Sequence, residues 1–375
     1  MKIVIDTDIP YIRGVFEPYF SEVLYKKGVD IDSIDVKDAQ ALIIRTRTVC
    51  NKELLKNSSL KVIATATIGT DHIDINYCKS RGIEVFSAPG CNAGGVLQWV
   101  LSALFEMSND FELKRKVLGV IGVGRIGNLV VNAARALGLS VLQCDPPREK
   151  LEGKKHFESL KTLIRECNIF SFHVPLTYIG TDATFRMADE FFFNSIKPNA
   201  WILNSARGGV LEEKVMLNFI SKKKLKFALD VWENEPLISH SVLNNAIIGT
   251  PHIAGYSKEG KVRASVMVVN AVSDFFNLSL KNWYPTPDPL EQKIHIDATD
   301  YIDNKLINYK KLFQKIYPIL NDDKALRDNP VNFEELRNNY NQRNENCSYT
   351  FSSIVDDSQI NILENLGFGS ITYNP

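Results

Sequence analysis

The chain opens with short apolar runs that are separated by longer, mixed polar stretches. Such alternation predicts parallel strands joined by helical crossovers, because each strand is buried on both faces and each connection must return over the sheet. The runs that we expect as strands are KIVID (2–6), ALIIRT (41–46), LKVIATA (60–66) and GIEVFSA (82–88). The pattern therefore predicts a small α/β domain at this end of the chain.

The stretch GVLQWVLSALFEM (95–107) is apolar on most sides, which is typical of a helix buried between two bodies. A second series of apolar runs follows, and residues 124–138 and 158–168 between them show helical spacing. The expected strands of this series are 117–123, 139–145, 169–174, 200–206, 226–232 and 246–250. Residues 257–277 predict one long helix, which we expect to return the chain to the first domain.

The composition changes after residue 280. The stretch NWYPTPDPL (282–290) is a proline-rich connector. Beyond it, helical and strand-like segments at 304–317, 332–340, 347–354 and 358–368 predict a small α+β domain of about 90 residues. We therefore expect three domains, which comprise residues 1–92 with 256–280, residues 93–255, and residues 281–375.

Charge and cysteine usage limit the classes of protein. The formal net charge is zero, which argues against an electrostatic surface for nucleic acid. The first ten residues, MKIVIDTDIP, contain acids and no apolar stretch long enough for a signal peptide or a membrane span. The six cysteines form no CxxC pair and lie at no ligand spacing from a histidine, so we expect no metal site. These features predict a cytoplasmic protein that binds neither membranes nor nucleic acid.

The stretch Gly122-Val123-Gly124-Arg125-Ile126-Gly127 follows an expected strand and opens an expected helix. In a dinucleotide-binding turn, Gly122 would allow the tight bend, Gly124 the approach of the pyrophosphate, and Gly127 the close packing of helix on strand. Asp145 lies about 18 residues past the last glycine, where such turns carry the acid that binds ribose. The glycines alone also fit a turn without a ligand, but the acid favours a cofactor site.

Asp145 indicates which dinucleotide binds. Its carboxylate would accept hydrogen bonds from the adenosine ribose and repel a 2′-phosphate, which favours NAD over NADP. Arg148 stands three residues further on and would pair with that phosphate. The sequence therefore predicts NAD and leaves the strictness of the preference open.

Three expected strands end next to polar residues, and the carboxyl ends of parallel strands meet in one crevice. There we expect His252 to exchange the proton of a substrate hydroxyl and Arg207 to hold a carboxylate bidentately. Glu235 would fix the tautomer of His252, with Glu233 as the alternative for this role. A packing role for His252 is the competing interpretation. Asp230 stands at a strand terminus, where it would face the nicotinamide.

These motifs resemble those of the D-2-hydroxyacid dehydrogenase family, in the stretches GVGRIG, NSARGGVLEE, ALDVWENEP and TPHIAGY. The resemblance covers roughly residues 40–275. It implies an α/β fold with two doubly wound parallel-sheet domains, a flavodoxin-like substrate domain and a Rossmann NAD domain. TATIGTDHID (65–74), CDPPR (144–148) and FEELRNNYNQR (333–343) narrow it to members that act on a phosphorylated 2-hydroxy acid. In these members the C-terminal α+β segment is a dimerisation domain, which implies a homodimer.

The resemblance also assigns residues by position. The implied catalytic set is Arg207, Glu235 and His252, with His252 as the acid/base. The implied cofactor contacts are Gly122, Gly124, Arg125, Ile126, Gly127, Asp145, Val174, Ser205, Ala206, Asp230 and Gly255. The implied substrate contacts are Arg45, Thr46, Thr67 and Tyr256. Val174 replaces a frequent threonine and keeps only a backbone contact, whereas Thr46 replaces a frequent serine and keeps the hydroxyl.

A phosphorylated substrate requires cations beyond the catalytic arginine. Arg45 and Arg47 alternate on one expected strand end and would face the same side. Arg337 and Arg343 would reach a site from the partner subunit of a dimer, and we hypothesise that Arg45 and one of these two hold the phosphate. Two other functions stay open at this point, a dehydrogenase of the same family acting on 3-phosphoglycerate or glycerate, and an NAD-sensing binding protein without catalysis.

Overall fold

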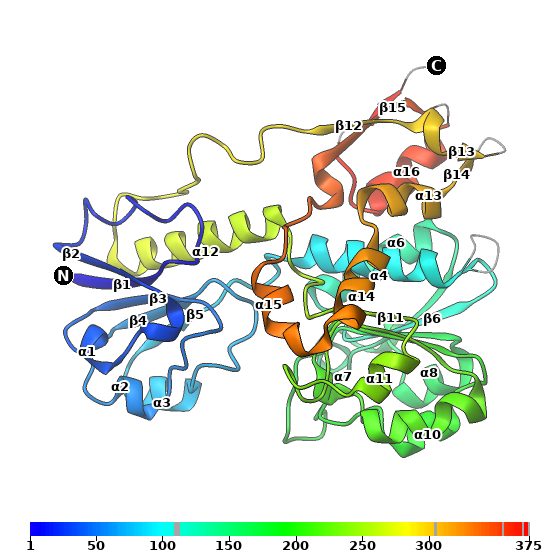
Figure 1. Cartoon of the computed structure of the whole chain (residues 1–375), viewed down its shortest axis with the longest axis horizontal. Coiled ribbons are helices and arrows are strands. Elements are labelled where there is room, and N and C mark those ends of the chain that lie inside the picture. Colours follow the sequence, from blue (N-terminus) through cyan, green and yellow to red (C-terminus); the bar gives the residue numbers. More distant parts are fainter. Residues whose placement is uncertain (109–112, 304–305, 355, 370, 374–375) are drawn as a thin grey trace. The chain divides into compact units, whose positions relative to one another are not determined.

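A computed structural model of the protein describes residues 1–108, 113–303, 306–354, 356–369 and 371–373. The chain forms two compact units, one of Met1–Asn92 with Ser257–Gln292, and one of Ala93–Tyr256 with Lys293–Pro375. Their elements are labelled in Figure 1. The chain thus leaves the first unit after Asn92 and returns to it at Ser257. These positions lie close to the bounds expected from the sequence, which are residues 92 and 256.

The first unit contains one parallel sheet with strand order β2-β1-β3-β4-β5, the order of flavodoxin-like folds. Its strands are β1 (Lys2–Asp6), β2 (Glu22–Lys26), β3 (Ala41–Ile44), β4 (Val62–Thr65) and β5 (Glu84–Phe86). The predicted flavodoxin-like domain is confirmed, but β2 was not predicted. This strand, EVLYK, lies at the edge of the sheet and is nowhere fully buried, so it lacks the apolar run that marks the central strands.

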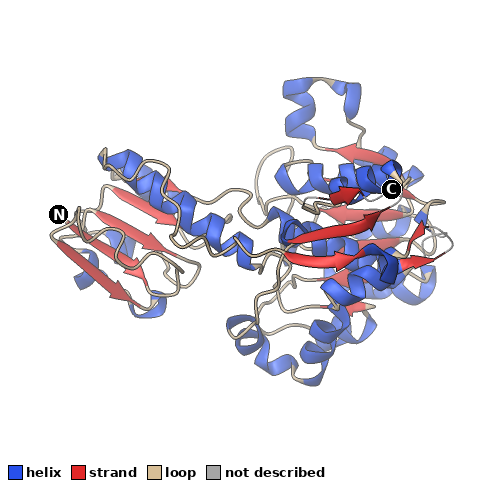
Figure 2. Ribbon diagram, turned by 90° about the horizontal axis from the view of Figure 1, so that it is seen from above, coloured by secondary structure: helices blue, strands red, loops and turns tan. Residues whose placement is uncertain are grey.

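Helices cover both faces of this sheet (Figure 2). They are η1 (Gly28–Asp30), α1 (Ser33–Val36), α2 (Lys52–Leu55), α3 (Ile75–Ser80) and α12 (Lys258–Phe276). The long helix α12 was predicted, and its Val268 and Val272 pack in one core cluster with Ile3 and Ile5 of β1. The short helices α1 to α3 close the opposite face in a second cluster. The result is a three-layer α/β unit.

The second unit contains a six-stranded parallel sheet with the order β11-β10-β9-β8-β6-β7. Its strands are β6 (Val117–Ile121), β7 (Ser140–Cys144), β8 (Ile169–Phe172), β9 (Trp201–Asn204), β10 (Lys226–Leu229) and β11 (Ile248–Gly249). All six were predicted, and each ends before its predicted last residue. The chain passes from β7 on one side of β6 to β8 on the other, so the topological switch lies beside Gly122–Gly127. Dinucleotides bind at such a switch point.

The helices of the sheet connections include the predicted 124–138 and 158–168. They are α6 (Arg125–Ala136), α7 (Pro146–Glu152), η2 (Lys154–His156), α8 (Leu160–Glu166), α9 (Glu190–Ser195), η3 (Gly208–Val210), α10 (Glu213–Lys223) and α11 (His240–Asn245). The predicted apolar helix is α4 (Ala93–Met107). Trp99 and Val100 on it are fully buried, and the helix packs against α6 and the C-terminal segment.

Residues 293–375 contribute a parallel sheet with the order β12-β15-β16 and a two-stranded antiparallel hairpin. Their elements are β12 (Ile294–Asp297), η4 (Ala298–Tyr301), β13 (Ile302–Asp303), β14 (Leu306–Ile307), α13 (Tyr309–Ile316), α14 (Ile319–Asp328), η5 (Pro330–Asn332), α15 (Phe333–Asn338), η6 (Asn346–Ser348), β15 (Tyr349–Ile354), α16 (Asp357–Asn365) and β16 (Ile371–Tyr373). The predicted mixture of helices and strands in the C-terminal segment is therefore present.

This segment shares a core with the rest of the second unit. The rings of Tyr309 and Phe313 on α13 pack on Phe105 of α4, with centroids 5.7 and 5.0 Å away. On α14, Asp323 accepts a hydrogen bond from the Gly249 N–H of β11 at 2.7 Å. The structure thus joins 293–375 to residues 93–256, whereas the sequence pattern suggested a separate body. Across the described ranges, no helix has the length and apolar character needed to cross a bilayer.

Candidate active site

The glycine turn after β6 has the features that a bound dinucleotide requires. Gly122 has a φ of +83°, which side chains other than glycine rarely adopt. A Cβ at Gly127 would overlap the Gly122 carbonyl, so only glycine allows α6 to pack this closely on the strand. At Gly124, in contrast, no atom lies within 4 Å of an added Cβ. The backbone at the start of α6, with Arg125 and Ile126, is therefore open to an approaching phosphate.

Asp145 directly follows β7 and is fixed beside this turn. Its Oδ2 accepts a hydrogen bond from the Val123 N–H at 2.8 Å, and its Oδ1 accepts one from the Arg148 N–H at 3.1 Å. Each oxygen keeps a lone pair that can accept from a ribose hydroxyl. Arg148 donates to the Val123 carbonyl and pairs with Glu152 at 2.6 Å. The arginine that would favour a 2′-phosphate is thus engaged with an acid.

The remaining predicted cofactor contacts lie just beyond strands of the same sheet. Val174 stands two residues past β8, and Ser205 and Ala206 directly follow β9. In the described part of the chain, Ser205 Oγ is buried and has no hydrogen-bond partner. A buried hydroxyl is normally hydrogen-bonded, so a ligand that accepts or donates here would complete its bonding. These residues, with the turn and Asp145, fit the NAD that the sequence predicted.

His252 lies three residues past β11 and contacts one carboxylate directly. Its Nδ1 lies 2.6 Å from Glu235 Oε2, and Glu235 Oε1 accepts the Trp232 N–H at 2.9 Å. Because an ionised carboxylate only accepts, Nδ1 carries a proton and Nε2 is the nitrogen that can exchange one with a substrate. Burial favours a neutral Glu235, but the charge of His252 and its hydrogen bond outweigh burial and lower the pKa of Glu235.

Glu233, the alternative partner for His252, points elsewhere. Its Oε1 lies 3.3 Å from the guanidinium of Arg186, and its backbone N–H donates to Glu213 Oε1 at 2.8 Å. Burial raises the pKa of Glu213 to about 7. The geometry therefore selects Glu235 as the carboxylate beside the histidine.

Arg207 stands beyond β9, next to the strand that leads to Glu235. Its Nη1 donates to the Ala206 carbonyl at 2.8 Å, and its side chain is half-buried. A Cβ at the neighbouring Gly208 would overlap the Trp232 carbonyl, so glycine lets the two strand ends approach closely. The structure thus places Arg207 at the strand end adjacent to that of Glu235, within the same sheet.

Asp230 has partners that the sequence did not reveal. Its carboxylate accepts hydrogen bonds from Thr250 Oγ1 at 2.6 Å, from the Ile253 N–H at 2.8 Å and from the Ala254 N–H at 2.9 Å. The side chain is buried, and burial raises its pKa. In this structure Asp230 holds the loop that follows His252. The predicted contact of Asp230 with the nicotinamide stays a prediction.

Tyr256, a predicted substrate contact, follows Gly255 at the end of this loop. Its hydroxyl accepts a hydrogen bond from Arg337 Nε at 3.0 Å, and the guanidinium carbon lies 5.7 Å from the centre of its ring. Arg337 therefore reaches Tyr256 within its own chain. The hypothesis that the tail arginines serve a partner subunit did not anticipate this contact, because the two residues are 81 positions apart.

The first unit carries the other predicted substrate residues. Strand β3 ends at Ile44, so Arg45, Thr46 and Arg47 lie in the turn after it. The prediction that the two arginines alternate on one strand is therefore wrong. Thr67 Oγ1 donates to the Gly69 carbonyl at 2.9 Å, beyond the end of β4.

Lys261, in the first turns of α12, is a cation near Arg45 that sequence reasoning missed. Burial and the charge of Arg45 together lower the pKa of Lys261 to about 8. The first unit therefore contains a second basic group beside the predicted substrate arginine.

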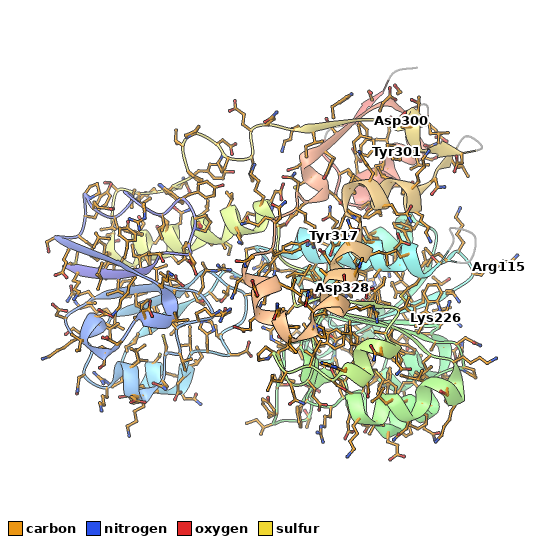
Figure 3. The ribbon with its side chains drawn as sticks, viewed as in Figure 1. Arg115, Lys226, Asp300, Tyr301, Tyr317 and Asp328 are labelled. Carbon is orange, nitrogen blue, oxygen red and sulfur yellow. The ribbon has the colours of Figure 1, made fainter. Side chains whose placement is uncertain are left out.

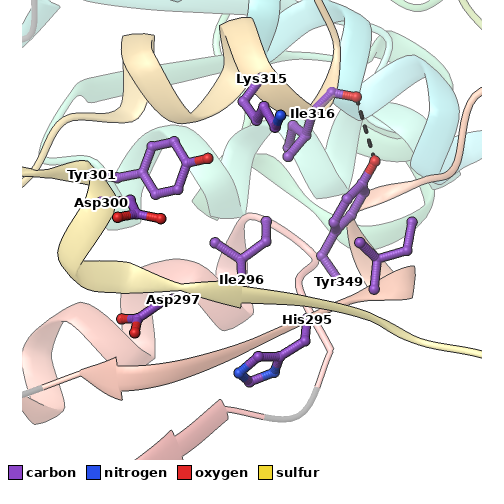
Figure 4. Close-up of a pocket in the computed structure, with 9 residues that line it drawn as sticks. His295, Ile296, Asp297, Asp300, Tyr301, Lys315, Ile316 and Tyr349 are labelled. Carbon is purple, nitrogen blue, oxygen red and sulfur yellow. Dashed lines mark hydrogen bonds between the residues drawn. The ribbon is translucent and has the colours of Figure 1, made fainter.

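A further pocket of about 350 Å³ lies in the C-terminal segment (Figure 4). It is lined by Ile294, His295, Ile296, Asp297, Asp300, Tyr301, Lys315, Ile316 and Tyr349, and the Tyr349 hydroxyl donates to the Ile316 carbonyl at 3.4 Å. None of the predicted site residues takes part in it. Among the described residues, no three His, Cys, Asp or Glu side chains lie together in a way that could hold a metal ion.

Comparison with known proteins identifies the class. Residues 98–254 match the NAD binding domain of D-isomer specific 2-hydroxyacid dehydrogenases. The solved structure of D-lactate dehydrogenase from Aquifex aeolicus, complexed with NAD and lactic acid, superimposes with a TM-score of 0.63 and 26% identity, over 74% of this chain and 96% of that one. An NAD-binding domain of this kind, with a histidine–carboxylate pair at its strand ends, defines an NAD-dependent dehydrogenase of the D-2-hydroxyacid class.

Curated relatives narrow the class. Erythronate-4-phosphate dehydrogenase of Bacteroides fragilis is 42% identical over 355 residues, which are 93% of this chain and 98% of that enzyme. The enzyme of the same name from Escherichia coli O157:H7 is 36% identical and covers 99% of both chains. The chain belongs to the erythronate-4-phosphate dehydrogenase family. Both relatives match almost the full chain, which includes the C-terminal segment.

Proposed function

We propose that the protein oxidises 4-phospho-D-erythronate to 2-oxo-3-hydroxy-4-phosphobutanoate with NAD⁺, a step in the synthesis of vitamin B6. The observation that carries this proposal is the 2.6 Å contact of His252 Nδ1 with Glu235, at the strand ends of a chain that matches its family over almost its whole length. A match to 3-phosphoglycerate dehydrogenase of Entamoeba histolytica, at 24% identity, supports the fold alone.

The reaction requires a proton and a hydride to leave the same carbinol. Bound NAD⁺ supplies the acceptor for the hydride of C2. His252 Nε2 takes the proton of the C2 hydroxyl, and the resulting imidazolium is stabilised by Glu235 at Nδ1. Arg207 holds the substrate carboxylate bidentately and polarises the carbonyl that forms. In the reverse reaction, the reduction of the 2-oxo acid, the same groups act and His252 donates the proton as the acid.

The cofactor would lie along the end of the six-stranded sheet. Backbone N–H groups after Gly122 and Gly124 would hold its pyrophosphate, and Asp145 would accept from its adenosine ribose. Ser205, whose buried hydroxyl lacks a partner among the described residues, would bind the cofactor near the catalytic end. The engagement of Arg148 with Glu152 supports a preference for NAD.

The substrate phosphate would bind in the first unit. Thr46 and Thr67 supply hydroxyls there, and Arg45 supplies a cation at the end of β3. If Arg45 holds the phosphate, Arg45→Ala will raise KM for 4-phosphoerythronate far more than KM for unphosphorylated erythronate, because only the first loses an ion pair. Equal effects on both acids would contradict this assignment.

The proposal extends to assembly and location. We expect a homodimer formed through the C-terminal segment, where the edge strand β12 and the half-exposed Ile294 offer an unpaired sheet edge. Light scattering of the pure protein tests this. The six cysteines all lie in the described ranges and form no disulfide there, which supports a reducing, cytoplasmic location.

The decisive experiment compares the wild type with His252→Ala in NAD-dependent oxidation of 4-phosphoerythronate, followed by NADH absorbance. We expect the variant to lose turnover and to bind NADH with wild-type affinity, because His252 moves a proton and does not hold the dinucleotide. Parallel assays with 3-phosphoglycerate and glycerate test substrate choice. NADH binding without turnover of any of these acids by the wild type would refute the proposal.

A further inference from the structure

Arg343, in the C-terminal segment, binds the loop that follows His252. Its Nη1 donates to the carbonyl oxygens of Ile253 at 3.1 Å and Tyr256 at 3.3 Å, and its Nη2 donates to that of Ala254 at 2.5 Å. Nη2 also reaches the Gly95 carbonyl at the start of α4, at 3.0 Å. One guanidinium thus binds three of the four residues after His252 and ties them to a buried helix.

Asp230 binds the same peptides from their donor side. It accepts the N–H groups of Ile253 and Ala254, whose carbonyl oxygens accept from Arg343. The two charged side chains come from a strand end and from a segment more than 100 residues further along the chain. Between them, they bind both the N–H and the C=O groups of two successive residues.

Arg343 is itself held in place. Its guanidinium carbon lies 4.0 Å from the ring centre of Tyr317, whose position at the end of α13 is labelled in Figure 3. Its Nε donates to Gln98 at 2.8 Å, and its Nη1 donates to the Tyr340 hydroxyl at 3.2 Å. The hydroxyls of Tyr317 and Tyr340 in turn both donate to Asp322, at 2.9 and 3.0 Å. An arginine with this many fixed partners acts as a rigid support and not as a mobile surface charge.

We propose that Arg343 is a positioning residue of the active site, which together with Asp230 fixes the loop that carries His252 and Tyr256. This inference rests on the proposed function for the roles of those two residues. It gives the C-terminal segment a part in catalysis within its own chain, besides any part in assembly.

The loop needs such support because of its own conformation. His252 has a φ of +55°, in the left-handed region that residues other than glycine rarely adopt. In this backbone conformation its Nδ1 lies 2.6 Å from Glu235 Oε2. A shift of about 1 Å at a reacting group can slow catalysis by about 100-fold. Support of the peptides after His252 therefore bears directly on turnover.

The test replaces Arg343 by methionine, which keeps most of the volume and removes every hydrogen bond. At a temperature where the variant is folded, we expect kcat to fall about 10- to 100-fold. The affinity for NADH should fall less than kcat, because the glycine turn and Asp145 are untouched. The deuterium isotope effect on kcat with C2-deuterated substrate should rise, and the amides of Ile253 and Ala254 should exchange with solvent faster.

Arg327→Met is the matched control. Arg327, on the neighbouring α14, also donates to two backbone carbonyls, those of Leu243 at 2.7 Å and Ala246 at 2.8 Å, and neither lies in the loop. We expect this variant to lose stability and to keep the wild-type kcat and isotope effect. If both variants lower kcat equally, Arg343 acts only through general stability and the inference is wrong.

Arg343→Lys and Tyr340→Phe cover the case in which Arg343→Met does not fold. The donors of lysine all sit on one nitrogen, which cannot reach the carbonyl oxygens of Ile253, Ala254 and Tyr256 together. We therefore expect kcat of Arg343→Lys to stay below that of the wild type. Tyr340→Phe removes one bond to Nη1, and should raise exchange at Ile253 and Ala254. Wild-type kcat and exchange in a folded variant would overturn the inference. If the wild type itself does not oxidise 4-phosphoerythronate, the proposed function fails, while the exchange measurement still tests the support by Arg343.

Discussion

Replacing Glu235 by glutamine removes one negative charge beside His252 and keeps the shape of the side chain. Both carboxylate oxygens accept a hydrogen bond in the structure, Oε1 from the Trp232 N–H at 2.9 Å and Oε2 from His252 Nδ1 at 2.6 Å. Glutamine has one acceptor oxygen and one NH₂ group. One of the two donors must therefore face another donor, or His252 must change to the tautomer that carries its proton on Nε2.

The size of the effect follows from these contacts. A hydrogen bond to a charged group contributes about 1.5–3 kcal/mol, and its loss in the transition state lowers a rate about 10- to 150-fold. In the oxidation, the imidazolium forms only as the reaction proceeds, so the loss appears in kcat and leaves NADH binding unchanged.

The assay is the oxidation of 4-phosphoerythronate, followed by NADH absorbance over a range of pH. Glu233→Gln is the matched control, because it makes the same chemical change two residues away. Glu233 lies 3.3 Å from Arg186, a pair whose arginine side chain is 48% exposed and whose loss should change kcat less than about twofold. Equal losses in the two variants, or a larger loss in Glu233→Gln, would refute the assignment of Glu235.

Two further predictions concern the cofactor and the pH dependence of stability. Asp145→Asn should lower the preference for NAD over NADP about tenfold in kcat/KM, because the carboxylate that repels a 2′-phosphate is gone; an unchanged ratio would contradict this. Burial raises the pKa of Glu213 from 4.5 to about 7, so the folded state favours the protonated acid, and its contribution to stability is lost as the pH rises through 7. Urea unfolding should show that Glu213→Gln gains up to about 3 kcal/mol over the wild type between pH 5 and pH 8, and a constant difference would count against a buried acid.

The strands of both main sheets could be predicted because central parallel strands are apolar along their whole length. The same rule placed the glycine turn, Arg207, Glu235 and His252 at strand ends, although it could not choose between Glu233 and Glu235. The rule did not predict strand β2, because this strand lies at the edge of the sheet and its sequence EVLYK is partly exposed. Helix α14 was also missed, because Asp323 takes a buried position between Ile319 and Leu326 and interrupts the apolar period.

The contacts of Asp230 and Arg343 show where such prediction stops. The end of a strand tells where a side chain lies, and Asp230 directly follows β10. It does not tell which neighbour the side chain binds, and in the loop the partners are backbone N–H and C=O groups, which nearly every residue offers. Such contacts leave no pattern in the loop sequence. It follows that a change of Asp230 or Arg343 removes these backbone contacts at once, although the residues that make them lie far apart in the sequence.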